Sequence, residues 1–373
     1  MRAMEAAPDT LWSILTGQAR RPSLEPGDAI LLAESAEFSM PIESPVPGLV
    51  LRSANTRAPA VFTKTVRLTQ AGQKLERVKI VPGAEPAAVE ISAPNCEVAW
   101  CEVTGFAARG IVVQKGGTNA HIHHNWVHDQ APLVGAAVAG IIAGTGRGTT
   151  ADSMKALIEL NLIERLRAFQ AIEFKSSDNT AQLNTVLDGG EIVVRHGSRN
   201  RTIANWVENG LIGLCGDDPV SMFDRVFGRT PNRGPSGIAI RAGTIPPGPP
   251  QASEYVPARR AIIIETDSDI IDGWIKGDGW TVAPVESRSR RFRGRIERGG
   301  RPGGVRVDDD ASDARRIVPR KLTPAMVGPN GRDDGRHRRL RLVPRRLYRR
   351  DRAPGAGGDR LDLDERVHVR RRA

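Results

Sequence analysis

A twenty-residue repeat in the middle of the chain limits the folds that it can adopt. Equivalent residues recur at this spacing: Ile172, Ile192 and Ile212, and, three positions later, Lys175, Arg195 and Cys215. If each period is one turn of a solenoid, equivalent residues stack on neighbouring strands about 4.8 Å apart. Lys175 and Arg195 then lie side by side, so either an acidic partner neutralises the two cations or they handle an anionic substrate.

An asparagine-led pattern extends the repeat beyond these turns. Its copies run from Asn119 to Val127, from Asn179 to Val186 and from Asn200 to Val207. Short runs of Ile, Val and Leu alternate with turns rich in Gly, Asn, Asp and Ser, and helical periodicity is scarce. These features predict an all-β, single-stranded parallel β-helix. We interpret Asn184 and Asn205 as turn residues that adopt the left-handed conformation and stack their amides in a ladder.

The chain divides into three parts. Residues 1–19 are expected to cap the solenoid, because Asp9–Leu15 is typical of a short amphipathic helix with Asp9 as its N-cap. Such a helix covers the open strand edges at one end. Residues 20–286 form the predicted β-helix, which we expect to be monomeric. We find no apolar stretch of transmembrane length and no secretory signal peptide near the N-terminus.

The formal net charge of +11 belongs to the C-terminal tail, residues 287–373. This tail carries 26 Arg and one Lys against 12 acidic residues, which leaves −4 for residues 1–286. Three interpretations stay open: a nucleic-acid-binding arm, a disordered solvated extension, or an out-of-frame translation of a GC-rich gene. We favour the last two, expect no nucleic-acid partner, and expect removal of the tail to leave folding unchanged. Lys321–Pro329 stands out within it as ordinary sequence.

Two short motifs resemble polysaccharide lyase family 6, which includes alginate lyases and chondroitinase B. They are Lys175-Ser-Ser-Asp-Asn179 and, sixteen residues after Asn179, Arg195-His-Gly197; the match also includes Asn161–Arg165 upstream. The resemblance is strongest over residues 139–227. It implies a right-handed parallel β-helix that cleaves an anionic uronate polysaccharide by β-elimination, and an extracellular or periplasmic location.

The resemblance assigns the catalytic base to Lys175 and the acid or charge stabiliser to Arg195. A neighbouring guanidinium disfavours the charged lysine and makes the neutral amine more available. Arg195 stays protonated and stabilises negative charge on oxygen. Strand alternation places Glu173 on the same face as Lys175. Further candidates for binding the uronate are His196, Arg165, Arg199 and Arg201.

The resemblance also implies a calcium site, and this chain departs from it. Family members place two glutamates five and seven residues before the lysine, where this chain has Gln170 and Ala168. Asn161 remains as the one matching metal ligand, and calcium requires several oxygen ligands. We therefore expect no cofactor. His121 and His123 share a strand face and are an alternative metal pair, but we expect exposed or turn histidines.

The sequence thus favours a polysaccharide lyase that acts on an alginate-like uronate polymer. The alternative is a non-catalytic β-helix that binds glycans or acts as an adhesin. A β-helix hydrolase or epimerase is a third class, but a hydrolase needs paired carboxylates in the cleft. Glu173, Asp178 and Asp188 do not form a convincing pair by their spacing.

Overall fold

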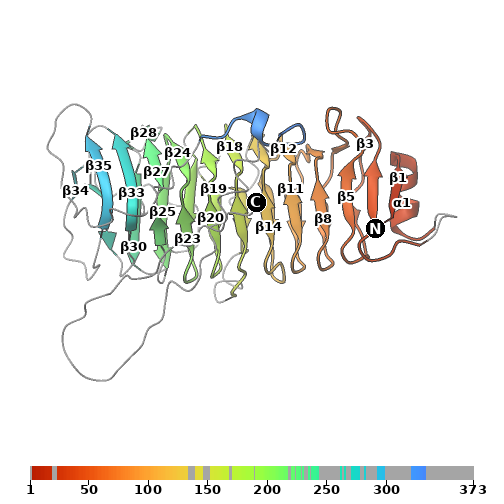
Figure 1. Cartoon of the computed structure of the whole chain (residues 1–373), viewed down its shortest axis with the longest axis horizontal. Coiled ribbons are helices and arrows are strands. Elements are labelled where there is room, and N and C mark those ends of the chain that lie inside the picture. The colour runs from red at the N-terminus through yellow and green to blue at the C-terminus, as the bar shows by residue number, and fades with distance from the viewer. Residues whose placement is uncertain are drawn as a thin grey trace, which may run out of the picture.

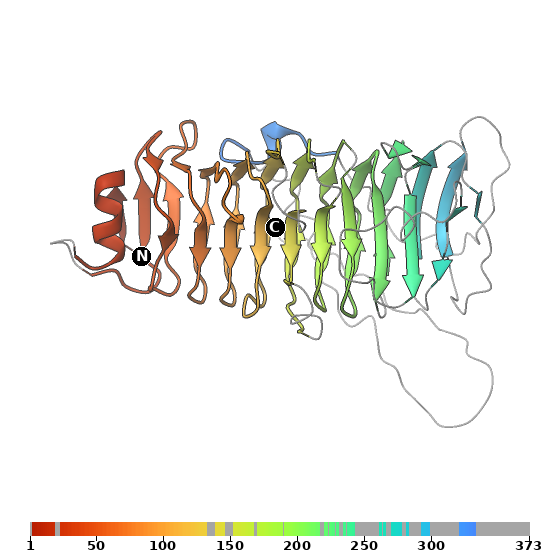
Figure 2. The ribbon, with the colours of Figure 1, turned by 180° about the vertical axis from the view of Figure 1, so that it is seen from behind.

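The computed structural model describes residues 2–18, 23–132, 139–145, 152–167, 170–188, 190–216 and 321–332, and, from 217 to 298, Asp224 and the strands named below. Short strands lie across the long axis of the molecule and stack side by side from one end to the other (Figures 1 and 2). Most turns of the chain contribute one strand to each of three parallel ladders. The predicted parallel β-helix is therefore confirmed.

Ladder 1 comprises β1 (Ala3–Ala6), β2 (Ala29–Leu32), β5 (Val50–Ser53), β8 (Lys74–Glu76), β11 (Glu97–Ala99), β14 (His121–His123), β17 (Leu157–Glu159), β20 (Thr180–Gln182), β23 (Arg201–Ile203) and β26 (Val220–Met222). Ladder 2 comprises β3 (Glu37–Phe38), β6 (Val61–Phe62), β9 (Lys79–Ile80), β12 (Glu102–Thr104), β15 (Trp126–His128), β18 (Leu162–Glu164), β21 (Thr185–Val186), β24 (Trp206–Glu208) and β27 (Arg225–Phe227). Ladder 3 comprises β4 (Ile42–Glu43), β7 (Val66–Leu68), β10 (Ala87–Ile91), β13 (Arg109–Val113), β16 (Ala139–Ala143), β19 (Gln170–Phe174), β22 (Glu191–Val194), β25 (Leu211–Gly216), β30 (Gly237–Ala242) and β32 (Ile264–Glu265).

We number the coils from the first that contains all three strands, β2, β3 and β4, to the eighth, which contains β23, β24 and β25. Beyond the ninth, β33 (Ile270–Gly277) pairs with β26 and β27, and β35 (Phe292–Arg298) pairs with β33, all in parallel. Parallel pairing thus continues past residue 286, where we expected the β-helix to end. Two small pairs complete the strands: β28 (Arg229–Thr230) with β29 (Gly234–Pro235), and β31 (Ala261–Ile262) with β34 (Thr281–Val282).

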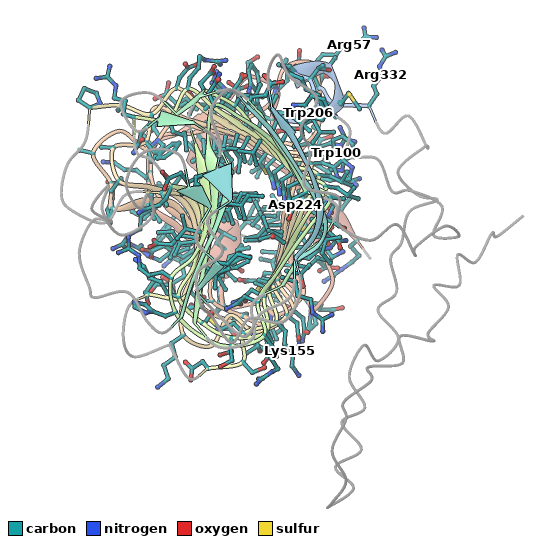
Figure 3. All side chains as sticks on the ribbon, turned by 90° about the vertical axis from the view of Figure 1, so that its left-hand side faces the viewer. Arg57, Trp100, Lys155, Trp206, Asp224 and Arg332 are labelled. Carbon is teal, nitrogen blue, oxygen red and sulfur yellow. The ribbon has the colours of Figure 1, made fainter. Side chains whose placement is uncertain are left out.

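Alternating residues of each strand fill the interior with stacked aliphatic side chains, which Figure 3 shows end-on. In ladder 3 the register aligns Ile141, Ile172, Ile192 and Ile212, and all four are fully buried. Each such side chain contributes roughly 1.5–3 kcal/mol through burial. The twenty-residue repeat is therefore the length of coils seven and eight, measured between the isoleucines of ladder 3. The other coils differ in length, but their inward side chains still stack in the same column.

A short helix, α1 (Pro8–Leu15), and β1 cover the N-terminal end of the β-helix (Figure 1). The helix buries Leu11, Ile14 and Leu15, as its amphipathic pattern predicts. Its N-cap is Ala7 and not Asp9, because the helix begins at Pro8, whose missing N–H suits the first helical position. In the described part of the chain, no helix has the length and apolar character that crossing a membrane requires.

The turn from ladder 1 to ladder 2, which we call the asparagine corner, holds a buried ladder of amides. Its members are Asn125, Asn161, Asn184 and Asn205, followed by Asp224, all with no exposed surface. Each amide Nδ2 donates to the next Oδ1, over 3.0, 3.0, 3.0 and 2.8 Å. The same oxygens accept the backbone N–H of the preceding member. The predicted amide ladder is confirmed, and Figure 3 shows Asp224 within the ring of strands.

The backbone conformation at this corner differs from our expectation. The left-handed residue is the one before each asparagine: His124, Leu160, Leu183 and Ala204 have φ between 53° and 56°. The asparagines themselves do not have positive φ. The preceding residue makes the turn, and the asparagine that follows it can then direct its amide into the interior. The ladder, and not a tolerance of left-handed backbone, explains why this position is asparagine.

One stretch of the C-terminal tail packs against the β-helix. Residues 321–332, which we call the strap, include a 3-10 turn (Pro324–Met326), η2, and lie along the outer side of ladder 2 (Figure 1). We expected the tail to have little order, and the strap departs from that expectation. It contains the stretch, Lys321–Pro329, whose composition differed from its arginine-rich surroundings.

Candidate functional site

Lys175 and Arg195 occupy the turn from ladder 3 to ladder 1 of the next coil, which we call the lysine corner (residues 175–179 and 195–200). Phe174 pairs with Val194, so the residues that follow them are equivalent in coils six and seven. Strand-like hydrogen bonding continues, because the Arg195 N–H donates to the Phe174 oxygen over 2.9 Å. The predicted stacking of the two cations is confirmed. Their side chains are largely buried, with 14% and 4% of their surface exposed.

Glu173 lies between the two cations. It belongs to β19 and shares the outer face with Lys175, while Ile172 and Phe174 point into the core. One carboxylate oxygen lies 2.9 Å from Lys175 Nζ, and the other lies 3.0 Å from Arg195 Nε. Glu173 is 1% exposed, so this triad is a buried ion-pair cluster.

Gly197 explains why the second motif requires glycine after Arg195 and His196. Its φ is +89°, and a Cβ there would lie 2.2 Å from the Ser176 carbonyl oxygen. Real Cβ atoms do not approach that closely, so only glycine lets this turn pack on the turn that follows Lys175. The motif residue Gly197 therefore fixes the spacing of the two cations through the backbone.

Buried amides lock the same turns from the inside. Asn179 Nδ2 donates to the Ser176 carbonyl and to Asn200 Oδ1, each over 3.0 Å, and Asn200 Nδ2 donates to the Ser176 carbonyl over 2.9 Å. Both asparagines are fully buried. The Ser198 N–H donates to Ser177 Oγ over 2.9 Å. Most polar residues of the two motifs thus hold the backbone from which Lys175 and Arg195 project.

His196 and Arg199 belong to the lysine corner, as predicted. His196 is 7% exposed, and its carbonyl accepts a hydrogen bond from Asn200. Arg199 contacts Asp178 through two bonds of 2.7 and 2.8 Å, and its guanidinium holds the pKa of that carboxyl below its usual range. Arg201 is the first residue of β23 and lies just beyond this corner, half-buried. Their roles toward a substrate stay predictions.

Arg165 lies at the wrong end of the strand to join this site. It follows β18, before β19 begins, whereas Lys175 follows the end of β19. Five residues of β19 place the two about 17 Å apart along the strand. Arg165 instead pairs with Asp129 over 2.7 Å and with Glu164, and it lowers the pKa of Asp129 to about 2. Arg165 therefore lies apart from the lysine corner, and its role in binding a uronate stays a prediction.

The described residues do not fit a calcium site. Asn161 belongs to the asparagine corner, where its side-chain oxygen accepts hydrogen bonds from the backbone and amide of Asn125. The resemblance implied that Asn161 is a metal ligand, but its side chain instead belongs to the amide ladder that stabilises the turn. Within the described ranges, no group of three His, Cys, Asp or Glu side chains is arranged to hold a metal. We derive no chemical step through a metal.

The histidine pair on β14 lies on the outer face of ladder 1, where each ring contacts a carboxylate. His121 Nε2 is 2.8 Å from Glu159, and His123 Nε2 is 3.0 Å from Glu97. The rings lie 4.1 Å apart, centre to centre. Contact with His123 and Lys74 lowers the pKa of Glu97 to about 2, despite partial burial. His121 and His123 share a strand face, as predicted, and are half-buried in a network of hydrogen bonds, whereas we expected exposed or turn histidines.

Two residues near the site carry signals that sequence reasoning missed. Glu191 begins β22, is fully buried and pairs in register with Gln170, where the family resemblance implies a glutamate. Arg241 pairs with Cys215, so it continues the column of Lys175 and Arg195 two coils further on. The pairing of the strands, and not the sequence period, aligns these two residues with the site. An irregularity at Gln170–Ile172 and a coil of 26 residues interrupt the twenty-residue period.

No protein-family model matches the chain, and no curated protein matches it. Among solved structures, it is similar to the PL6 family alginate lyase AlyGC, with a TM-score of 0.53 and 14% identity over 79% of this chain. The chain spans about half, 51%, of the length of AlyGC. It is also similar to an alginate lyase from Paenibacillus sp. str. FPU-7, with a TM-score of 0.51 and 13% identity over 79% of this chain and 99% of that chain. The parallel β-helix fold is thus shared with solved polysaccharide lyases.

Proposed function

We propose that this protein is a polysaccharide lyase that cleaves an alginate-like uronate polymer by β-elimination. The observation that carries the proposal is the pairing of Lys175 and Arg195 on adjacent coils around one buried carboxylate. The fold that the chain shares with solved alginate lyases supports the same reaction class. We propose both the uronate substrate and the catalytic roles of these two residues.

In the proposed reaction, the neutral Nζ of Lys175 accepts the proton from the ring carbon next to the uronate carboxylate. The electron pair of that C–H bond forms a carbon–carbon double bond, and the bond from the adjacent ring carbon to the glycosidic oxygen breaks. That oxygen takes up a proton from water. The guanidinium of Arg195 stabilises the negative charge that develops on oxygen during the step.

Glu173 gives the site its order before substrate arrives. One carboxylate contacts both cations, so their separation is set even though both side chains are long and flexible. A uronate carboxylate entering the corner competes with Glu173 for the same two cations. We therefore expect Arg195 to be shared between Glu173 and the substrate during turnover.

The test is incubation of purified protein with alginate, dermatan and pectate while the ultraviolet absorbance of unsaturated uronate is followed. The proposal predicts a steady increase with alginate as the preferred polymer. Absence of product on all three polymers under conditions where the protein is folded would contradict it. Product from pectate alone would keep the lyase and change the substrate.

A non-catalytic glycan-binding β-helix is the second candidate, and one observation favours it. Glu173 already pairs with both cations, as in a purely structural ion-pair cluster. Retardation of the protein in gels that contain alginate, without any product in the absorbance assay, would support this alternative. Retardation together with product supports the lyase.

A further inference from the structure

The strap crosses the outer face of ladder 2 from the eighth coil back to the third. At its beginning, Lys321 Nζ lies 2.9 and 3.0 Å from the two carboxylate oxygens of Glu208, in coil eight. The Leu322 N–H donates to Thr185 Oγ1, in coil seven, over 2.8 Å. The first two residues of the strap thus contact two different coils.

The middle of the strap buries an apolar cluster. Leu322 and Val327 pack on Leu162, in coil six, and the three side chains are 3%, 1% and 0% exposed. Trp126, in coil five, packs against the edge of this cluster. Burial of two aliphatic side chains in this way contributes a few kcal/mol to a fold. The strap therefore adds a second, smaller core outside the coils.

The C-terminal end of the strap is held by hydrogen bonds to its own backbone groups. The Gly328 N–H donates to the His124 carbonyl over 2.8 Å, at the asparagine corner of coil five. Arg77, at the same corner of coil three, donates from Nη1 to the Pro329 carbonyl over 3.0 Å. These bonds involve backbone groups of the strap, so they depend on its path and not only on its side chains.

The distance that the strap covers agrees with its length. Coils three and eight are five steps apart, or about 24 Å at about 4.8 Å a step. The nine residues from Lys321 to Pro329 can extend up to roughly 30 Å, and the turn at Pro324–Met326 shortens the strap. The segment that packs on the β-helix also differs from the rest of the tail in composition. No arginine occurs from Lys321 to Gly331, although the tail is otherwise rich in arginine.

We propose that the strap is an intramolecular clamp that couples coils three to eight. In a solenoid, each repeat contacts only its neighbours, so stability is a sum of local terms. A segment that contacts coils three, five, six, seven and eight adds coupling between coils that do not touch. The tail is then required for the full stability of the β-helix, which reverses the expectation that its removal leaves folding unchanged.

The first test compares two strap variants of the full chain, Leu322→Asp and Ala325→Asp. Both add one carboxylate to the same segment, but Leu322 is buried and Ala325 is exposed. The clamp predicts that Leu322→Asp lowers the thermal midpoint by about 5 °C more than Ala325→Asp does, since an unpaired charge cannot stay buried. Equal shifts in the two variants would overturn the proposal.

A second test holds even if Leu322→Asp fails to fold. Leu322→Ala and Leu162→Ala remove the two sides of one contact, and the double variant removes both. Docking of the strap predicts that the double variant loses less in thermal midpoint than the two single variants lose in total. Strictly additive losses would show that the two side chains do not meet, and would overturn the clamp.

Discussion

The two polar corners of this β-helix contain similar asparagines but differ in the charge that they carry. At the asparagine corner, the buried polar side chains from Asn125 to Asn205 are neutral amides, and each satisfies the next along the solenoid axis. At the lysine corner, Asn179 and Asn200 form the same kind of inner ladder. Lys175, Glu173 and Arg195 lie outside that ladder and carry charge.

The difference separates stabilisation from chemistry. Amides repeat without accumulating charge, so a ladder of any length costs little electrostatic free energy. Charged residues cannot repeat in this way, and the lysine corner holds its two cations only with a buried carboxylate between them. This charged cluster is confined to two coils, and the proposed function rests on it.

The largest loss of stability is expected when the amide ladder is interrupted. Asn184→Leu removes the oxygen that accepts both the backbone N–H and the amide of Asn161, each over 3.0 Å. Two buried donors without an acceptor lower the free energy of unfolding by about 4 kcal/mol. Chemical denaturation measures this loss.

Asn55→Ala is the matched control for the ladder. Asn55 accepts one hydrogen bond, from the Arg57 N–H, at the surface. Its loss is expected to stay below about 1 kcal/mol. Similar losses for the two variants would mean that the ladder contributes no more than an ordinary turn.

Removal of the carboxylate from the lysine corner ranks second. Glu173→Gln leaves two largely buried cations without their shared partner, and we expect a loss of about 3 kcal/mol together with a lower rate of uronate cleavage. Glu90→Gln is the control, because Glu90 pairs with Arg67 over 3.0 Å on the same outer face of ladder 3. An unchanged cleavage rate in Glu173→Gln would remove Glu173 from the site.

The contact between the two motif turns comes third. Gly197→Ala forces a Cβ against the Ser176 carbonyl, with an expected loss of about 2 kcal/mol and a displaced Lys175. Gly27→Ala is a close control, since Gly27 has a similar φ of +84° but nothing within 4 Å of an added Cβ. A difference in unfolding free energy between the two variants reports the clash alone. No difference would contradict the close packing of the two turns.

The smallest effect is expected on the open face of ladder 1, and it depends on pH. Contact with His123 and then with Lys74 lowers the pKa of Glu97 from 4.5 to about 2. A lowered carboxyl pKa contributes stability that is present above pH 4.5 and is lost as pH falls toward 2. Glu97→Gln should therefore flatten the fall in thermal midpoint over this window. An unchanged profile would show that Glu97 is not stabilised by its partners.

The sequence predicted the parts of this molecule that repeat. Inward Ile172, Ile192 and Ile212 recur every 20 residues and the amides of Asn184 and Asn205 after 21, so stacking follows from a nearly constant period. Arg165 and Lys175 are close in sequence but far apart in space, because they lie on either side of a strand. Glu191 and Arg241 were missed because coils of unequal length hide the register. The docking of the strap depends on contacts across more than a hundred residues, such as Lys321 with Glu208, which no local pattern encodes.

We propose that the lysine corner performs β-elimination with Lys175 as the base. The most direct measurement is the rate of unsaturated uronate formation from alginate by the unaltered protein, by Lys175→Ala and by Lys79→Ala. Lys79 is a matched lysine that pairs with Glu102 over 2.8 Å on ladder 2, away from the site. We expect Lys175→Ala to lower the rate by about 100-fold or more and Lys79→Ala to leave it unchanged. A Lys175→Ala protein that retains the full rate would contradict it.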